Sequence, residues 1–226
     1  DINLEQAWKT YGNGNHDTIV AMIDTGIDYT HEDLKDTLWV NTDEIPGNGI
    51  DDDGNGYVDD VYGWNFYNNN NQIFTGEEDS HGTHGAGTIS AGTGNGIGIA
   101  GIVPGNRVRV MALKALGGTD GGGSTAAVIK AIRYAEDNGA VICNLSLTST
   151  VDDKALYEAM KNSSMLFVVA TGNGNPKTGK GVDTDAIPFY PAAYDLDNII
   201  SVANLSIDGT LSASSNYGKK TVDLAA

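Results

Sequence analysis

Short apolar runs that alternate with amphipathic helices are the feature that most limits the folds open to this chain. The runs are nearly continuous and rich in β-branched residues, and they cover residues 18–23, 107–113, 141–147, 165–170 and 198–202. Continuous apolar strands are typical of a sheet buried on both faces, and helical crossovers are what parallel pairing requires. The sequence therefore predicts an α/β fold of three layers, with a mostly parallel central sheet and helices on both faces.

The helices expected between these strands have recognisable ends. Ser124 is a capping residue in front of a helix that runs through Asp137 and is closed by Gly139, and a second helix covers 152–161. A glycine-rich loop over 117–123 precedes the first of them. No long repeat and no linker divides the chain, so residues 1–226 are expected to form a single domain.

The charge balance excludes one large class of partner. Lys and Arg number 13 against 30 Asp and Glu, which gives a formal net charge of −17. Such a field repels phosphate backbones and suits divalent cations, so a nucleic-acid binder is not expected. The longest clear apolar run, 165–170, falls far short of the roughly 18 residues of a membrane span. The single cysteine, Cys143, excludes an internal disulfide and a cysteine-rich metal site.

Three polar residues stand where the sheet is expected to carry its chemistry. Asp24 ends the first apolar run, His81 begins a helix, and Asn173 follows the fourth run. Each alone also fits a turn or a helix end. Because ligands and catalytic groups gather at the carboxyl ends of parallel strands, the three together predict an acid, a base and an amide donor at one edge.

Around these residues the sequence resembles the subtilisin-like serine peptidases, the subtilases, from about Trp8 to the last residue. The resemblance is carried by VAMIDTGID at 20–28, SHGTH at 80–84, NLSL at 144–147 and ATGN at 170–173. It implies that His81 is the general base, that Asp24 orients and stabilises it, and that Asn173 donates to an oxyanion. The implied activity is endopeptidase cleavage of peptide bonds in proteins.

The resemblance also implies how a substrate binds. A protein or peptide would lie as an extended strand between two walls, one formed by Gly121, Gly122 and Gly123 and the other by Ser146 and Leu147. Thr148 stands where the family usually has glycine, which narrows the first specificity pocket. A flexible turn is the less favoured alternative for the glycine loop. The chain's own C-terminal segment or a propeptide are further expected partners.

The nucleophile is absent from this sequence. The family carries its serine in a Gly-Thr-Ser motif on a downstream helix, and no such motif occurs here. This chain alone is therefore expected not to hydrolyse peptides. Either it is part of a longer peptidase, or the serine helix comes from another chain. Without that helix an apolar groove should be exposed, which the rest of the domain is expected to fill.

Calcium is the cofactor that the resemblance implies. Asp33 matches a family calcium ligand, with the Asn95 side-chain oxygen and the carbonyls of Ile97 and Ile99 completing the set. The stretch 51–56, DDDGNG, resembles the front of a calcium loop, but Tyr62 stands where such a loop has its glutamate. A solvated acidic loop is an equal alternative there.

Taken together, these features predict a secreted, calcium-stabilised serine endopeptidase domain of subtilisin type that lacks its serine-bearing end. The alternative is a non-catalytic binding or regulatory protein built on the same scaffold. The intact acid, base and oxyanion residues argue against that alternative.

Overall fold

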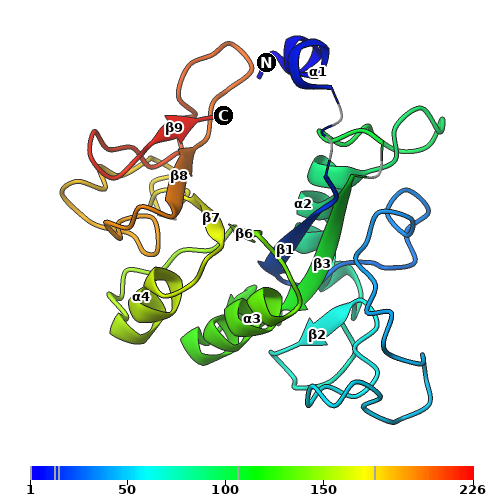
Figure 1. Cartoon of the computed structure of the whole chain (residues 1–226). Helices are drawn as coiled ribbons and strands as arrows, with labels where there is room; N and C mark the ends of the chain where they lie inside the picture. The colour runs from blue at the N-terminus through cyan, green and yellow to red at the C-terminus, as the bar shows by residue number, and fades with distance from the viewer. Residues whose placement is uncertain (1, 13, 15, 106, 176) are drawn as a thin grey trace. The chain divides into compact units, whose positions relative to one another are not determined.

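The computed structural model describes residues 2–12, 14, 16–105, 107–175 and 177–226. Its helices and strands are, in chain order, α1 Leu4–Tyr11, β1 Thr18–Asp24, β2 Gly63–Asn65, the 3-10 helix η1 Glu77–Asp79, α2 Ser80–Ser90, β3 Val108–Lys114, β4 Leu116–Gly117, β5 Gly122–Gly123, α3 Thr125–Asp137, β6 Ile142–Leu145, α4 Lys154–Lys161, β7 Leu166–Ala170, β8 Ile199–Ala203 and β9 Leu224–Ala225 (Figure 1). The chain divides into two compact units, Thr10–Cys143 and Asn144–Ala226 with Asp1–Lys9, which are described separately below.

The seven-stranded sheet has the order β2-β3-β1-β6-β7-β8-β9, and β4 and β5 form a separate antiparallel pair. Within the first unit β3 pairs in parallel with both β1 and β2, and within the second unit β8 pairs in parallel with β7 and β9. The predicted α/β fold with a parallel central sheet is therefore confirmed.

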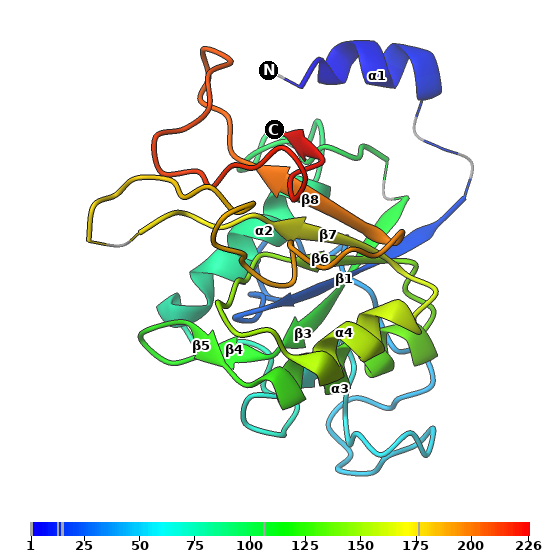
Figure 2. The same ribbon diagram turned by 90° about the vertical axis from the view of Figure 1, so that its left-hand side faces the viewer.

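Helices cover both faces of the β1–β3 pair. A side chain on Gly85 of α2 would meet Met22, whereas one on Gly139, just after α3, would meet Ile19, which points to the other face of the same strand. Figure 2 shows α2 and α3 on opposite sides of β1. The face under α2 is packed with buried apolar side chains: Val20, Met22, Ile27, Leu34, Leu38, Ile73, Ala86, Ala91, Val108, Val110 and Ala112. This packing fixes the end of β1, where Asp24 lies.

Local sequence signals explain the helix boundaries. The Ser124 hydroxyl accepts a hydrogen bond from the Ala127 amide, so α3 begins where the capping residue predicts, and it ends at Asp137 as expected. α4 begins at Lys154, capped by the Asp153 carboxylate, two residues later than the predicted start. Residues 41–60, which include the acidic stretch 51–56, form a loop that holds no helix or strand.

The sequence analysis did not predict the short strands β2, β4 and β5. β2 has only three residues, one of them glycine, which is too short to show a strand period. The glycine loop is more ordered than a flexible turn, because β4 and β5 pair there in the register Leu116 with Gly123 and Gly117 with Gly122. Glycines have no side chains, so these residues show no alternation of apolar and polar side chains that would predict the pairing.

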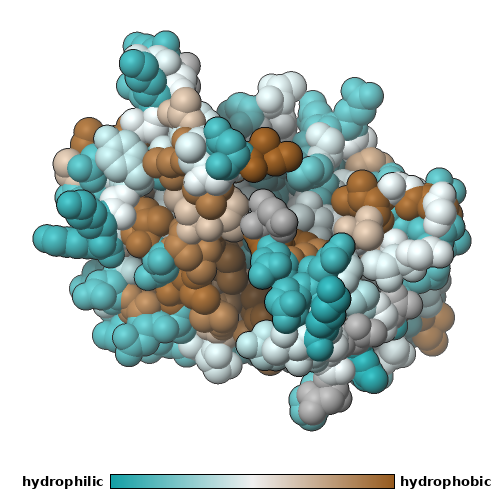
Figure 3. Space-filling model, turned by 90° about the horizontal axis from the view of Figure 1, so that it is seen from above, coloured by the Kyte–Doolittle hydropathy of each residue, from teal (hydrophilic) through white to brown (hydrophobic). Residues whose placement is uncertain are grey.

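Among the described residues no helix has the length and apolar character needed to cross a bilayer. Several large apolar side chains are nonetheless exposed, and the face drawn in Figure 3 carries apolar side chains among hydrophilic ones.

Candidate active site

The first unit brings Asp24 and His81 into direct contact. Asp24 is the last residue of β1 and is 1% exposed, while His81 is the second residue of α2 and its side chain is 60% exposed. The distance from His81 Nδ1 to Asp24 Oδ1 is 2.7 Å. A buried carboxylate thus binds one ring nitrogen of the imidazole, while most of the His81 side chain is exposed.

The loop that follows β1 fixes the geometry of this pair. The Thr25 amide donates to Asp24 Oδ1 at 2.7 Å, and the Thr25 hydroxyl accepts from the Gly82 amide at 3.1 Å. A side chain on Gly82 would collide with the carbonyl oxygen of Gly26, so only glycine lets the first turn of α2 approach the strand end this closely. Acid and base are therefore connected through the backbone as well as through their side chains.

The electrostatics of the pair favour a protonated imidazole. The hydrogen bond to Asp24 raises the pKa of His81, partial burial opposes this, and the negative charge of Asp24 adds to the increase. A proton on Nδ1 that is donated to the carboxylate leaves Nε2 as the nitrogen that can accept a second proton. This is the arrangement that a general base requires.

A second pair of charges is buried below this site, and the sequence did not predict it. Lys114, the last residue of β3, is 2% exposed and donates from Nζ to the Thr25 carbonyl and to Asp79 Oδ1. Asp79 is 0% exposed and lies two residues before His81. The sequence analysis missed the lysine because the apolar run is expected to end at Leu113, one residue before it.

Asn173 lies in the second unit, three residues after the end of β7, and is exposed. Its neighbours Gly172 and Gly174 have φ of +99° and +75°, where a side chain is strained. Asn216, which is 0% exposed, fixes this turn: its side-chain amide donates to the Thr171 carbonyl at 2.8 Å and its backbone amide donates to the Gly172 carbonyl at 2.9 Å. No motif in the sequence indicates this role of Asn216.

Two predicted site residues share one pocket in the second unit. Ser146 and Asn173 both line a cavity of about 270 Å³ whose walls also include Asn144, Val168, Ala170, Val202, Ala203, Asn204 and Ala226. Leu147, the other predicted wall residue, is half-buried beside Ser146. A pocket with apolar walls and a few polar groups is a typical ligand site.

The predicted glycine wall lies in the first unit, near the acid. Gly121 precedes β5, which is formed by Gly122 and Gly123, and a side chain on Gly121 would lie 4.0 Å from the Thr25 methyl carbon. Gly123 is exposed and could not carry a side chain, because one would collide with the Ala115 carbonyl. The loop therefore presents backbone rather than side chains beside the residue that follows Asp24.

The four residues of the first predicted calcium site lie together. Asp33 Oδ1 accepts from the Asn95 amide group at 2.7 Å, and Asp33 Oδ2 accepts from the Ile99 amide at 3.1 Å. The Asn95 oxygen accepts from the Ile97 amide at 3.1 Å. The hydrogen bond from Asn95 is the main cause that lowers the pKa of Asp33. Here the loop closes on the carboxylate through N–H donors, so a calcium ion would require the Asn95 amide to turn its oxygen inward.

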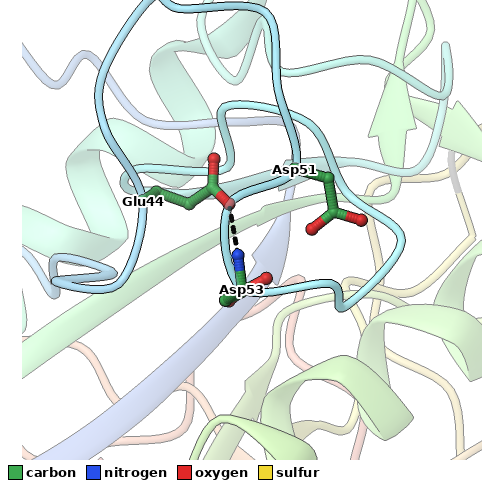
Figure 4. A group of neighbouring side chains, drawn as sticks. All are labelled: Glu44, Asp51 and Asp53. Atoms are coloured by element: carbon green, nitrogen blue, oxygen red, sulfur yellow. Dashed lines mark hydrogen bonds between the residues drawn. The ribbon is translucent and has the colours of Figure 1, made fainter.

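A second group of acidic side chains fits a metal ion better. Carboxylate oxygens of Glu44, Asp51 and Asp53 lie within 4.8 Å of one another (Figure 4). Glu44 is 5% exposed, and its carboxylate accepts from the amides of Asp52 at 2.8 Å and Asp59 at 2.9 Å. Hard carboxylate oxygens in a glycine-rich loop are the donors that Ca²⁺ prefers. The sequence analysis looked for a glutamate at position 62, where this chain has Tyr62. The glutamate that joins the group is Glu44, which precedes the acidic run.

Comparison with known proteins identifies the class to which this fold and site belong. The sequence profile of the Subtilase family matches residues 15–226, so the chain belongs to the subtilase family of serine peptidases.

Individual relatives agree with this assignment. The chain is 36% identical over 210 residues to the Major intracellular serine protease of Bacillus subtilis, covering 92% of this chain and 56% of that protein. It is 34% identical over 225 residues to Subtilisin-like protease 1 of Plasmodium falciparum, covering 92% of this chain but 32% of that protein. The crystal structure of a lanthipeptide protease matches with a TM-score of 0.68 and 25% identity over 99% of this chain and 59% of that one. This chain thus spans about a third to just over half of these relatives.

Proposed function

We propose that this chain supplies the acid, the base and the oxyanion donor of a serine endopeptidase, and that the nucleophilic serine lies outside these residues. The observation that carries the proposal is the 2.7 Å hydrogen bond between His81 Nδ1 and the buried carboxylate of Asp24. Membership of the subtilase family supports it. The substrate would be a protein or peptide bound as an extended strand along the glycine wall at 121–123 and beside Ser146 and Leu147.

The proposed mechanism assigns one step to each side chain. His81 Nε2 takes the proton of the serine hydroxyl as the oxygen attacks the peptide carbonyl, and then returns that proton to the leaving amine. Asp24 keeps the Nδ1 proton in place and stabilises the imidazolium that forms. Asn173 donates its side-chain amide to the oxyanion of the tetrahedral intermediate, where the negative charge develops.

A fluorophosphonate probe on the full-length protein tests this proposal. We expect a covalent adduct on one serine outside residues 1–226, and we expect His81→Ala to abolish the adduct while His84→Ala keeps it. His84 is a suitable control because it is exposed and lies one turn further along α2. A folded wild-type protein that gains no adduct would contradict the proposal and favour the non-catalytic alternative.

The pH dependence of activity follows from the raised pKa of His81. The protonated ring cannot accept the serine proton, so kcat/KM should rise with pH through a pKa above the ordinary value of 6.5. The bond to Asp24 also stabilises the folded state below that ordinary value, and this contribution is lost as the pH rises through the raised pKa. Measuring kcat/KM against pH should place the acid limb above 6.5, with His84→Gln unchanged. An acid limb at or below 6.5 would contradict this assignment.

We further propose that Ca²⁺ stabilises the chain, with Glu44, Asp51 and Asp53 as ligands and a second ion held by Asp33, Asn95, Ile97 and Ile99. The close approach of three carboxylates supports the first site. Asp60 supports an effect on stability, because it is 0% exposed at the end of the same loop and accepts from the Tyr134 hydroxyl of α3 at 2.5 Å. Ordering this loop would therefore order its contact with the core.

Calcium titration in a thermal unfolding experiment tests the first site. At about 100 times the dissociation constant, Ca²⁺ should raise the unfolding temperature by roughly 5–10 °C. Glu44→Gln should remove the part of this increase that comes from the first site, because it removes a charge while keeping an oxygen that accepts from the Asp52 amide. The control is Glu158→Gln on the exposed side of α4. An equal increase in wild type and Glu44→Gln would place the ion elsewhere.

The remaining expectations belong to the same proposal. Residues 1–226 would form one peptidase domain, and the pocket beside Asn173 would be filled by the protein's own C-terminal segment or by a propeptide.

Secretion of the protein is proposed as well. Matching relatives include a protease named as intracellular, from Bacillus subtilis, and one named as extracellular, from Natrialba magadii. Fractionation of the producing cells and their medium distinguishes the two locations.

A further inference from the structure

The buried ammonium of Lys114 connects the two segments that carry the acid and the base. In the parallel register Lys114 lies opposite Asp24 on β1. Its Nζ donates to the carbonyl of Thr25, the residue after Asp24, and to the carboxylate of Asp79, two residues before His81. Both charged side chains are removed from water, since Lys114 is 2% exposed and Asp79 is 0% exposed.

Asp79 is held on several sides. Its Oδ2 accepts from the amide and the hydroxyl of Thr75, at 2.5 and 2.9 Å, while Oδ1 faces Lys114. Its backbone carbonyl accepts from the Thr83 hydroxyl at 3.1 Å, one turn into α2. Asp79 is therefore attached to α2 both before His81, through the chain, and after it, through Thr83. A movement of Asp79 would be transmitted to the turn that carries the imidazole.

Stability alone does not account for this pair. Taking two charges out of water costs free energy, and apolar residues of similar volume often serve a core equally well. The Lys114–Asp79 pair differs from apolar residues at these positions because its hydrogen bonds have fixed directions. An ammonium between a carbonyl on the β1 side and a carboxylate on the α2 side fixes the separation of the two segments, which an apolar contact would leave adjustable.

We infer that Lys114 and Asp79 are positioning residues that hold Asp24 and His81 at hydrogen-bond distance. This inference rests on the proposed peptidase function, although it concerns a geometry that can be measured without catalysis. Besides Asp24 at the end of β1, the ionisable groups on the neighbouring segments include Asp28, the exposed Glu77, Glu78 and His84, and the Lys114–Asp79 pair. The Asp28 amide donates to the Thr83 hydroxyl, whereas the Lys114–Asp79 pair joins the two segments through buried charged side chains.

The decisive variant is the double substitution Lys114→Met with Asp79→Asn in the full-length protein. It removes both charges together and so leaves no buried charge without a partner. By NMR we expect the downfield Nδ1 proton of His81 to weaken or vanish and the His81 pKa to fall relative to wild type. We expect kcat to fall by about 10- to 100-fold with KM within about twofold, because a misplacement of about 1 Å can cost about 100-fold in rate.

The matched control is Lys130→Met, since Lys130 is an exposed lysine on α3. It should leave the His81 proton signal, its titration and kcat unchanged. If the double variant folds with a wild-type unfolding temperature and an unchanged His81 signal and kcat, the positioning role is overturned and the pair is merely structural. If the double variant does not fold, Asp79→Asn alone is compared with Lys130→Met by the same criteria.

The NMR measurement separates this inference from the proposed function. A wild-type protein that fails to react with a fluorophosphonate contradicts the peptidase proposal, yet its His81 signal still shows whether the pair positions the imidazole. A wild-type protein that reacts, combined with an unchanged His81 signal in the double variant, contradicts only the positioning role.

Discussion

Asp24→Asn in the full-length protein is expected to lower kcat by about 10⁴-fold while KM changes little. Asparagine keeps the shape of the carboxylate but presents either a donor or a neutral oxygen to His81 Nδ1. The imidazole then loses the anion that stabilises its protonated form, and the tautomer with its proton on Nδ1 is no longer enforced. Steady-state kinetics on a peptide substrate measure both constants.

The control for this substitution is Asp36→Asn, which changes an exposed aspartate of the same unit. It should retain full activity. The His81 pKa should fall in Asp24→Asn, because the bond that raises it is the one removed. A folded Asp24→Asn protein with kcat within about tenfold of wild type would show that Asp24 has a structural role only.

The sequence predicted those parts of the molecule that depend on local signals. The apolar run that ends at Asp24 predicts a buried strand, and Ser124 predicts the start of α3. Both predictions succeed because the hydrophobic pattern of a strand and the capping of a helix depend on residues close together in the sequence. The contact between Asp24 and His81 was expected from a resemblance spread over several motifs. Their 57-residue separation carries no local signal of its own.

The sequence could not predict contacts that depend on distant side chains meeting in the core. Lys114 has the same sequence neighbours as any solvated lysine at the end of a strand, and only the folded structure shows it buried against Asp79. Glu44 joins Asp51 and Asp53 because the intervening loop folds back, which a search at fixed loop spacing misses. Asn216 lies 45 residues from Thr171, whose carbonyl its side chain binds.

Two buried polar residues therefore have comparable structural roles in the two units. Lys114 binds the carbonyl of Thr25, directly after Asp24, and Asn216 binds the carbonyls of Thr171 and Gly172, the two residues before Asn173. In each case a residue without a predicted catalytic role immobilises the turn that presents a predicted one. Side chains on rigid turns lose little entropy when they meet a transition state, so such supports contribute to catalysis without touching the substrate.

Asn173→Ala in the full-length protein is expected to lower kcat by about 10²- to 10³-fold, with little change in KM. The amide would contact the oxyanion only after the carbonyl has been attacked, so its loss should affect the transition state more than substrate binding. Asn173 is exposed, and its turn is held by the backbone contacts of Asn216, so the substitution should leave the unfolding temperature unchanged.

The matched control is Asn204→Ala, because Asn204 lines the same pocket as Asn173 and is also exposed. If the pocket served substrate binding alone, both substitutions would raise KM and leave kcat in place. If Asn173 stabilises the oxyanion, only Asn173→Ala lowers kcat, and Asn173→Asp lowers it at least as far, since a carboxylate repels the developing charge. A kcat for Asn173→Ala within about threefold of wild type would contradict the oxyanion role of Asn173 in the turn between Gly172 and Gly174.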